Sequence, residues 1–162
     1  MTRLVAKPHQ VYWTDGSCHP NPGPGGFAVV RGGKLVASGY ETLSTNQRME
    51  LSAIHAALCL IAIVRQEYPR RHAEIRSDSQ YSLSCVQSVA TWANRGWRRV
   101  NNAPLKNLDI IKRIWDVYHD LDQVTLTHVR GHAGIIGNEM ADHYAALARL
   151  EGIVEGGRDC SR

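Results

Sequence analysis

Cysteine is scarce in this 162-residue chain, and its four copies show no paired spacing. Cys18, Cys59, Cys85 and Cys160 form neither the close pairs of a zinc site nor a redox motif. A chain of this length can bury one good hydrophobic core, so it does not need a disulfide framework. We therefore expect a reducing environment and a cytoplasmic location.

Long apolar runs are also missing. The longest, Ala56–Val64, is far shorter than the roughly 20 residues that cross a bilayer. Residues 1–10 lack the apolar segment of a signal peptide. The formal charge of +4 permits a polyanionic partner without requiring one. We expect one globular domain that has no membrane partner.

Three segments at hairpin spacing predict an antiparallel meander. β-Branched and aromatic residues lead up to Asp15, and a Pro/Gly-rich loop follows over residues 21–26. A second strand over residues 27–31 and a third over residues 35–40 flank a two-residue Gly32-Gly33 turn.

The rest of the chain alternates helices and strands. A helix over about residues 48–67, capped by Thr45 or Asn46, is apolar around most of its surface and should be central. The strand over residues 73–76 follows this helix and should run parallel to an earlier strand. The remaining elements are a helix from near Ser79, an irregular stretch over 89–107, an amphipathic helix over 107–120, a strand over 124–129, a flexible Gly-rich loop around His132 and a helix over about 138–151. We predict an N-terminal extension (1–9), one domain (10–151) and a flexible tail (152–162).

Four acidic residues lie near the ends of these elements: Asp15, Glu50, Asp78 and Asp142. Each alone would be an ordinary turn or cap residue. If the strands that end at Asp15 and Asp78 pair in parallel, both acids emerge at one sheet edge, where open sheets bind ligands. Clustered carboxylates repel one another, so they favour hard cations. Without a Cys/His ligand set, Mg²⁺ or Mn²⁺ is favoured over Zn²⁺, and two such ions can support phosphodiester hydrolysis.

Five sequence blocks, in order, resemble the type I ribonuclease H family of the bacterial-like single-domain kind. They are Tyr12–Cys18, Asn21–Gly26, Thr45–Leu51, Ser77–Tyr81 and Val129–Gly134 followed by Asn138–Asp142. The resemblance covers about residues 10–150. It implies an α/β ribonuclease H-like fold, with a mixed five-stranded sheet of three antiparallel then two parallel strands, flanked by helices on both faces. It also implies an endonuclease that cleaves the RNA strand of RNA–DNA hybrids with two Mg²⁺ ions, or Mn²⁺ as a substitute, leaving 5′-phosphate and 3′-hydroxyl ends.

The resemblance also assigns roles to residues. Asp15, Glu50, Asp78 and Asp142 match the metal-binding catalytic carboxylates, and His132 matches a loop histidine that assists proton movement or product release. The residues matched to the substrate site are Gly16, Ser17, Cys18, Asn21, Thr45, Asn46, Gln47, Gln80, Trp92, Trp97 and Asn138. For Trp92 and Trp97 a place in the core is an equal alternative. The region 92–99, with Arg95, Arg98, Arg99 and nearby Lys106, matches a basic protrusion that grips the DNA strand, although it has fewer lysines than the best-known bacterial pattern.

Two other functions stay open at this point. DNA-cutting enzymes share the fold, although they usually lack a Glu50-type helix motif together with a Gly-His-Ala-Gly loop. A binding module without chemistry would gain nothing from four carboxylates that face phosphates. The expected partner is an RNA–DNA hybrid duplex, and the expected state is a monomer.

Overall fold

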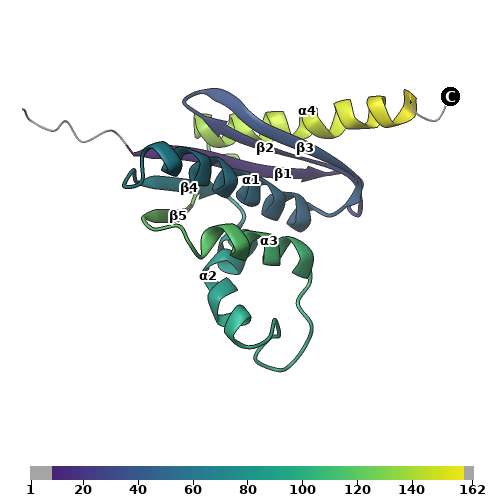
Figure 1. The fold of residues 1–162 in the computed structure, drawn as a ribbon. Helices are drawn as coiled ribbons and strands as arrows, with labels where there is room; N and C mark the ends of the chain where they lie inside the picture. Colours follow the sequence, from purple (N-terminus) through teal and green to yellow (C-terminus); the bar gives the residue numbers. More distant parts are fainter. Residues whose placement is uncertain (1–8, 159–162) are drawn as a thin grey trace, which may run out of the picture.

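The computed structural model describes residues 9–158 and is built around one mixed five-stranded sheet (Figure 1). Its strands are β1 (Gln10–Cys18), β2 (Gly23–Arg31), β3 (Lys34–Ser44), β4 (Ala73–Ser77) and β5 (Val124–His128). Their order across the sheet is β3-β2-β1-β4-β5. The first three strands pair antiparallel, whereas β4 pairs in parallel with both β1 and β5. This arrangement confirms the predicted meander and the predicted parallel strands.

Four helices cover the two faces of this sheet. They are α1 (Asn46–Glu67), α2 (Gln80–Asn94), α3 (Leu108–Tyr118) and α4 (Ile136–Arg158). Helix α4 lies over β1, β2 and β3 on one face, and α1 lies on the other face, with α2 and α3 beyond it (Figure 1). The predicted α/β class with helices on both faces is therefore confirmed.

Helix α1 is the centre of the hydrophobic core. The hydroxyl of Thr45 accepts a hydrogen bond from the Arg48 backbone N–H at 3.2 Å and so caps the helix. Leu51, Ile54 and Leu58 are fully buried among residues of the sheet and of α3. By length and composition alone α1 could cross a membrane, but half of its most apolar window is buried inside the protein. Its apolar character therefore has an explanation in core packing.

Close packing of glycines explains two elements that are longer than predicted. The tract 23–26 is not a loop but the start of β2, where a Cβ at Gly25 would lie 2.7 Å from the Met49 side chain. Helix α4 does not end at Glu151 but continues to Arg158, because Gly152 is buried where any Cβ would collide with the Tyr40 ring. Residues 152–158 of the predicted tail are thus part of α4, while 159–162 and most of the predicted N-terminal extension lie outside the described residues.

Two further corrections concern the helices that flank the site. The stretch from Val89 is helical as far as Asn94, since Val89 is buried in the core and no helix breaker precedes Gly96. Gly137 belongs to the first turn of α4, and not to the preceding loop, because it packs directly against the indole of Trp13. The three described cysteines, Cys18, Cys59 and Cys85, are free thiols.

Candidate functional site

Three of the four predicted acids meet at the C-terminal ends of β1 and β4. Asp15 lies in β1, Glu50 in the second turn of α1, and Asp78 directly after β4. Each offers a carboxylate oxygen, and these oxygens lie within 4.8 Å of one another. The parallel register places Thr14 beside Ser77, so the two strands deliver their acids to the same edge. The structure thus brings together the acids that the sequence places on three separate elements.

Burial makes this cluster electrostatically costly. Asp15 is 5% exposed and Glu50 is 9% exposed. Burial raises the pKa of Asp15 from 3.8 to about 7, and the charges of Asp78 and Asp142 act in the same direction. A hydrogen bond with Glu50 and another from the Gly16 N–H oppose this rise. Burial also raises the pKa of Glu50 well above 4.5, and the neighbouring Asp15 adds to the effect.

The cluster has the properties of a hard-cation site. The Glu50 Oε2 atom is buried and has no hydrogen-bond partner among the described residues. Three converging carboxylates supply the oxygen ligands that Mg²⁺ and Mn²⁺ prefer. A bound cation would satisfy the orphaned oxygen and offset the repulsion between the charges. The donor set therefore fits a divalent metal ion.

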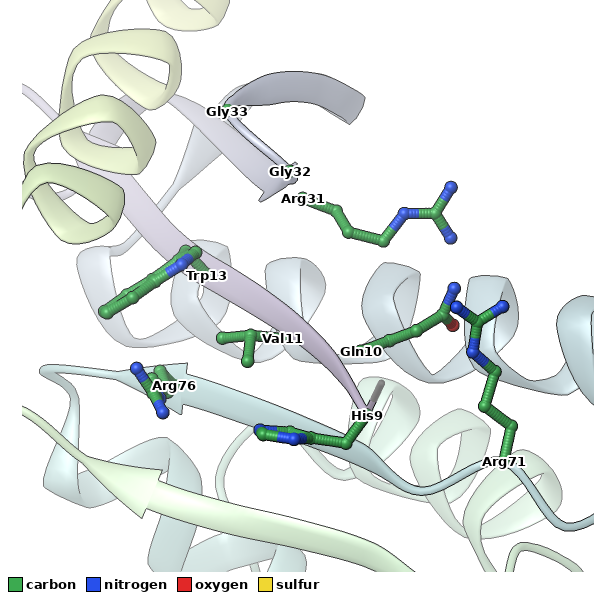
Figure 2. Close-up of a pocket in the computed structure, with 9 residues that line it drawn as sticks. All are labelled: His9, Gln10, Val11, Trp13, Arg31, Gly32, Gly33, Arg71 and Arg76. Atoms are coloured by element: carbon green, nitrogen blue, oxygen red, sulfur yellow. The ribbon is translucent and has the colours of Figure 1, made fainter. Parts of the chain in front are cut away.

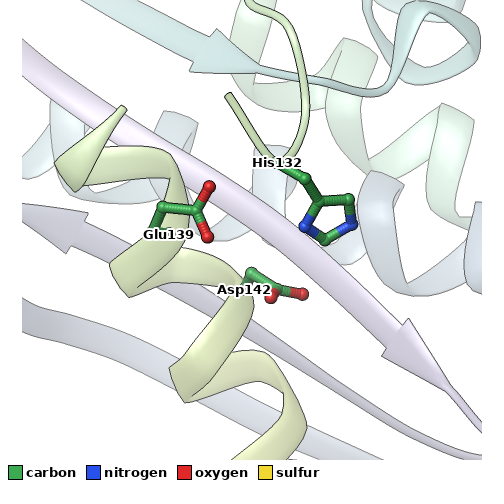
Figure 3. Close-up of side chains that lie close together, drawn as sticks. All are labelled: His132, Glu139 and Asp142. Atoms are coloured by element: carbon green, nitrogen blue, oxygen red, sulfur yellow. The ribbon is translucent and has the colours of Figure 1, made fainter. Parts of the chain in front are cut away.

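Asp142 belongs to a second cluster beside the first. His132, Glu139 and Asp142 each offer a ligand atom, and these atoms lie within 4.8 Å of one another (Figure 3). Asn138, buried at the start of α4, donates a hydrogen bond from Nδ2 to Asp78 Oδ2 at 3.3 Å and so ties α4 to the first cluster. His132 is exposed and has a positive φ of 51°. An exposed imidazole beside carboxylates can exchange protons with solvent and with a bound substrate.

Glu139 holds the loop that carries His132. Its Oε1 accepts a hydrogen bond from the Gly134 backbone N–H at 3.3 Å. The loop also lies close to Asp78, since a Cβ on Gly131 would stand 2.7 Å from Asp78 Oδ2. In the sequence Glu139 is part of the family-like block Asn138–Asp142, and the structure gives it a defined contact with this loop.

A row of polar groups continues from the acids along the end of β1. The Cys18 backbone N–H donates to Asn46 Oδ1 at 2.7 Å, and the Asn46 N–H donates to Asn21 Oδ1 at 3.3 Å. The Cys18 thiol faces inward and donates to backbone carbonyls, including that of Gly23 at 3.3 Å. Residues far apart in the sequence are therefore linked in one polar surface next to the acid cluster.

A cavity of about 470 Å³ extends this polar surface. Its lining residues are Asn21, Thr45, Gln47, Lys106 and Asn107. Three of them were predicted to bind substrate, and Lys106 was predicted to grip phosphate. Asn107 was missed: its Nδ2 donates to the Tyr81 hydroxyl at 3.2 Å, and its φ of 57° places it in the left-handed region. The only sequence signal was a polar Lys-Asn pair directly before an amphipathic helix.

Arg48 fixes the helix turn that carries several of these residues. Its guanidinium donates two hydrogen bonds to the Asp109 carboxylate, at 2.8 and 2.7 Å. Its Nε donates to Glu41 at 2.9 Å. The pKa of Asp109 is lowered by the hydrogen bonds from Arg48. Arg48 therefore joins β3, α1 and α3 one residue after Gln47 of the polar surface.

The other predicted substrate residues lie in more varied places. Ser17 is part of β1 and accepts a hydrogen bond from Arg149. Gln80 is exposed in the first turn of α2 and donates to Ser84, one turn later. Trp92 and Trp97 are partly buried and pack against the core, and Trp92 also lines a cavity of about 620 Å³ with Tyr81. The basic side chains Arg95, Arg98, Arg99 and Lys106 are all exposed.

A separate basic cavity lies around the first residues of β1 (Figure 2). It has a volume of about 520 Å³, and Arg31, Arg71 and Arg76 line it. Arg76 lies over the Trp13 ring at 5.0 Å and is paired with Glu74. None of the residues predicted to form the site lines this cavity.

Gly16 gives a direct test of how α1 is held against β1. A Cβ at Gly16 would overlap the backbone of Met49 and Glu50. We expect Gly16→Ala to lower the free energy of unfolding by about 1–3 kcal/mol, because α1 must move to relieve the overlap. Urea unfolding measures this, with Gly32→Asn as control at the first position of the open Gly32-Gly33 turn, where asparagine is favoured. Equal stability of Gly16→Ala and wild type would show that α1 is not pressed against β1 at this point.

Comparison with known sequences gives a consistent set of relatives. The family model described as RNase H matches residues 7–149. A ribonuclease H of Methylorubrum extorquens (strain PA1) is 41% identical over 148 residues, and the match covers 88% of this chain but only 61% of that protein. A ribonuclease H of Granulibacter bethesdensis is 40% identical over 146 residues, and the match covers 86% of this chain and 91% of that protein. The chain thus spans less than two thirds of the first relative and nearly all of the second.

Solved structures show the same fold. LC9-RNase H1, described as a type 1 RNase H with the type 2 active-site motif, has a TM-score of 0.69 at 28% identity, covering 90% of this chain and 74% of that chain. The foamy viral protease-reverse transcriptase in complex with RNA/DNA hybrid has a TM-score of 0.71 at 20% identity, covering 92% of this chain and 22% of that chain. The second likeness concerns the fold alone.

Proposed function

The chain belongs to the RNase H family, and on that premise we propose that it is an endonuclease that hydrolyses the RNA strand of RNA–DNA hybrids. The observation that carries this proposal is the convergence of Asp15, Glu50 and Asp78 within 4.8 Å at the end of β1, beside a polar surface. The similarity to curated ribonucleases H supports the choice of substrate.

Asp15, Glu50, Asp78 and Asp142 would hold two Mg²⁺ ions when substrate is bound. Bound there, the ions would supply an activated water and stabilise the charge on the leaving 3′-oxygen, which gives 5′-phosphate and 3′-hydroxyl ends. Asp15 is fixed for this role by the Gly16 N–H, and Asp78 by the Asn138 amide. His132, held near Asp142 by its loop, would move protons or assist product release.

The polar surface would select RNA in one strand. Asn21 and Gln47 line the cavity that extends this surface, and Asn46 is fixed by its hydrogen bond from Cys18. Amide and hydroxyl groups of this kind can exchange hydrogen bonds with ribose 2′-hydroxyls, which DNA lacks. The exposed Arg98 and Arg99 would bind phosphates of the DNA strand, at the far end of α2.

A cleavage assay with three duplexes tests this function. Labelled RNA–DNA hybrid, duplex DNA and duplex RNA are incubated with the protein and Mg²⁺, and products are resolved by length. We expect cleavage of the RNA strand of the hybrid only, at internal positions and with 5′-phosphate ends. Equal cleavage of duplex DNA would favour the DNA-cutting alternative, and hybrid binding without cleavage would favour a binding module.

A further inference from the structure

Arg149 of α4 lies on the same side of its helix as Asp142. The two residues are seven positions apart, which is about two helical turns and about 10 Å along the helix axis. Ser17, the hydrogen-bond partner of Arg149, follows Asp15 by two positions in β1. Because alternate residues of a strand point to the same face, Ser17 and Asp15 share a face of the sheet. Its position along α4 relative to Asp142 and its bond to Ser17 in β1 therefore both place Arg149 near the acid cluster.

The backbone at Arg149 is held in place by close packing. Ser17 and Gly26 are cross-strand partners in β1 and β2. Helix α4 crosses over this pair so closely that a Cβ on Gly26 would lie 2.6 Å from the Ala145 carbonyl oxygen and 2.9 Å from the Arg149 Cα. Because the backbone at this residue is fixed, the side chain of Arg149 can reach fewer positions. Arg149 is therefore preorganised at the end of β1.

The guanidinium of Arg149 has binding capacity that the described residues do not use. Its Nε donates to the Ser17 hydroxyl at 3.2 Å. Among residues 9–152, whose side chains the structure describes, no carboxylate forms an ion pair with it, whereas Arg48 and Arg76 both have such partners. Arginine presents five donors in a planar fork that matches the oxygens of a phosphate. The Nη groups of Arg149 are therefore suited to an anion from outside the protein.

We propose that Arg149, oriented by Ser17, binds a phosphate of the RNA strand a few nucleotides from the phosphate that is cleaved. This inference rests on the proposed function, which places the cleaved RNA phosphate at Asp15 and Asp142. A nucleic-acid strand carries one charge per about 3.4 Å of helix axis, so a group about 10 Å from Asp142 meets a phosphate about three nucleotides away. Arg149 would then set the position of the RNA strand over the acids.

Salt-dependent binding tests this contact without cleavage. Hybrid affinity is measured over a series of salt concentrations in an Asp78→Asn background, in which the hybrid stays intact. Arg149→Met is expected to weaken binding about three- to tenfold and to reduce the slope of log K against log salt by about 0.7–0.9, the value for one lost phosphate contact. Arg149→Lys should retain most of the slope, and Ser17→Ala should weaken binding less than Arg149→Met. Arg70→Met, which removes an exposed arginine from the loop after α1, is the matched control and should leave both quantities close to those of the background.

Neutral phosphate substitutions identify the strand and position. Single methylphosphonates are placed in turn in the RNA strand and in the DNA strand. At one RNA position the substitution should weaken binding to the Asp78→Asn protein but not further weaken binding to Asp78→Asn with Arg149→Met, because the two changes remove the same interaction. Additive losses at every position, or an unchanged salt slope with a lowered melting temperature, would overturn the inference and make Arg149 a structural bridge to Ser17. Failure of the wild-type protein to cut hybrid would instead overturn the proposed function.

Discussion

Asp15→Asn is expected to lower the rate of hybrid cleavage at least about a thousandfold while leaving the protein folded. Asparagine keeps the shape of the side chain and one oxygen, but it removes the charge at the centre of the acid cluster. A thousandfold loss corresponds to about 4 kcal/mol of transition-state stabilisation, which is within what a bound metal ion contributes. Single-turnover cleavage of labelled hybrid measures the rate, and thermal unfolding checks the fold.

Asp122→Asn is the matched control for this variant. Asp122 is exposed in the turn before β5, and only its backbone carbonyl takes part in a described hydrogen bond, with Arg65. The control removes the same charge without touching the cluster, so its cleavage rate should stay within about twofold of wild type. Cleavage by Asp15→Asn at a rate near that of the control would remove Asp15 from the catalytic set.

The acid cluster could be predicted from the sequence because two local rules agree. Asp78 directly follows a recognisable strand and Asp15 lies in the last part of another, which continues to Cys18 and not only to Asp15, and the intervening helix makes those strands parallel. Glu50 could be placed beside them because its position in the helical repeat of α1 is in line with the residues that face the core. Topology then leaves one edge at which these acids can emerge. Asp142 joins them less directly, as part of a second cluster with His132 and Glu139.

The sequence-based prediction of the fold is wrong mainly at glycines whose structural role depends on contacts with residues far away in the sequence. Gly25 and Gly26 indicate a loop when only neighbours in the sequence are considered. In the structure they are strand residues that let Met49 and α4 approach β2. Gly152 in the same way indicates a helix end, although it is where α4 packs on Tyr40. A glycine that makes a turn and a glycine that makes room for a neighbour look the same in a single sequence.

The hydrogen bonds that orient the site residues could not be predicted from the sequence, because they too join residues far apart in the chain. Arg48 and Asp109 are 61 positions apart, and Ser17 and Arg149 are 132 positions apart. No periodicity or local motif relates such pairs. Residues that match a family motif could therefore be predicted, whereas the residues that orient them needed the three-dimensional structure.

The stability of the metal-free protein is expected to fall as the pH rises from about 4.5 to about 7. In the folded state Asp15 keeps its proton up to about pH 7, whereas in the unfolded chain it loses that proton near pH 3.8. The folded state therefore binds more protons in this range, and the free energy of unfolding decreases with pH. A pKa that rises from 3.8 to about 7 sets an upper limit of about 4 kcal/mol on what Asp15 contributes to this change in stability. The raised pKa of Glu50 acts in the same direction.

Other groups titrate with the opposite sign, so the informative quantity is a difference between two proteins. Glu74 has a pKa lowered to about 2 by Arg76, and it adds stability as the pH rises from about 2 to about 4.5. Burial lowers the pKa of His55, which adds stability as the pH rises towards 6.5. Both contributions are present in wild type and in Asp15→Asn. Subtracting the two unfolding free energies, measured with urea at each pH in the presence of a chelator, removes them.

Asp15→Asn should be about as stable as wild type near pH 4.5 and more stable above about pH 7, because the variant has no buried charge to form at this position. Adding Mg²⁺ at pH 8 should then raise the melting temperature of wild type more than that of Asp15→Asn, since the ion offsets a repulsion that the variant lacks. A wild-type stability that runs parallel to that of the variant from pH 4.5 to pH 8 would contradict a raised pKa at Asp15. An equal Mg²⁺ effect in both proteins would mean that cations bind elsewhere.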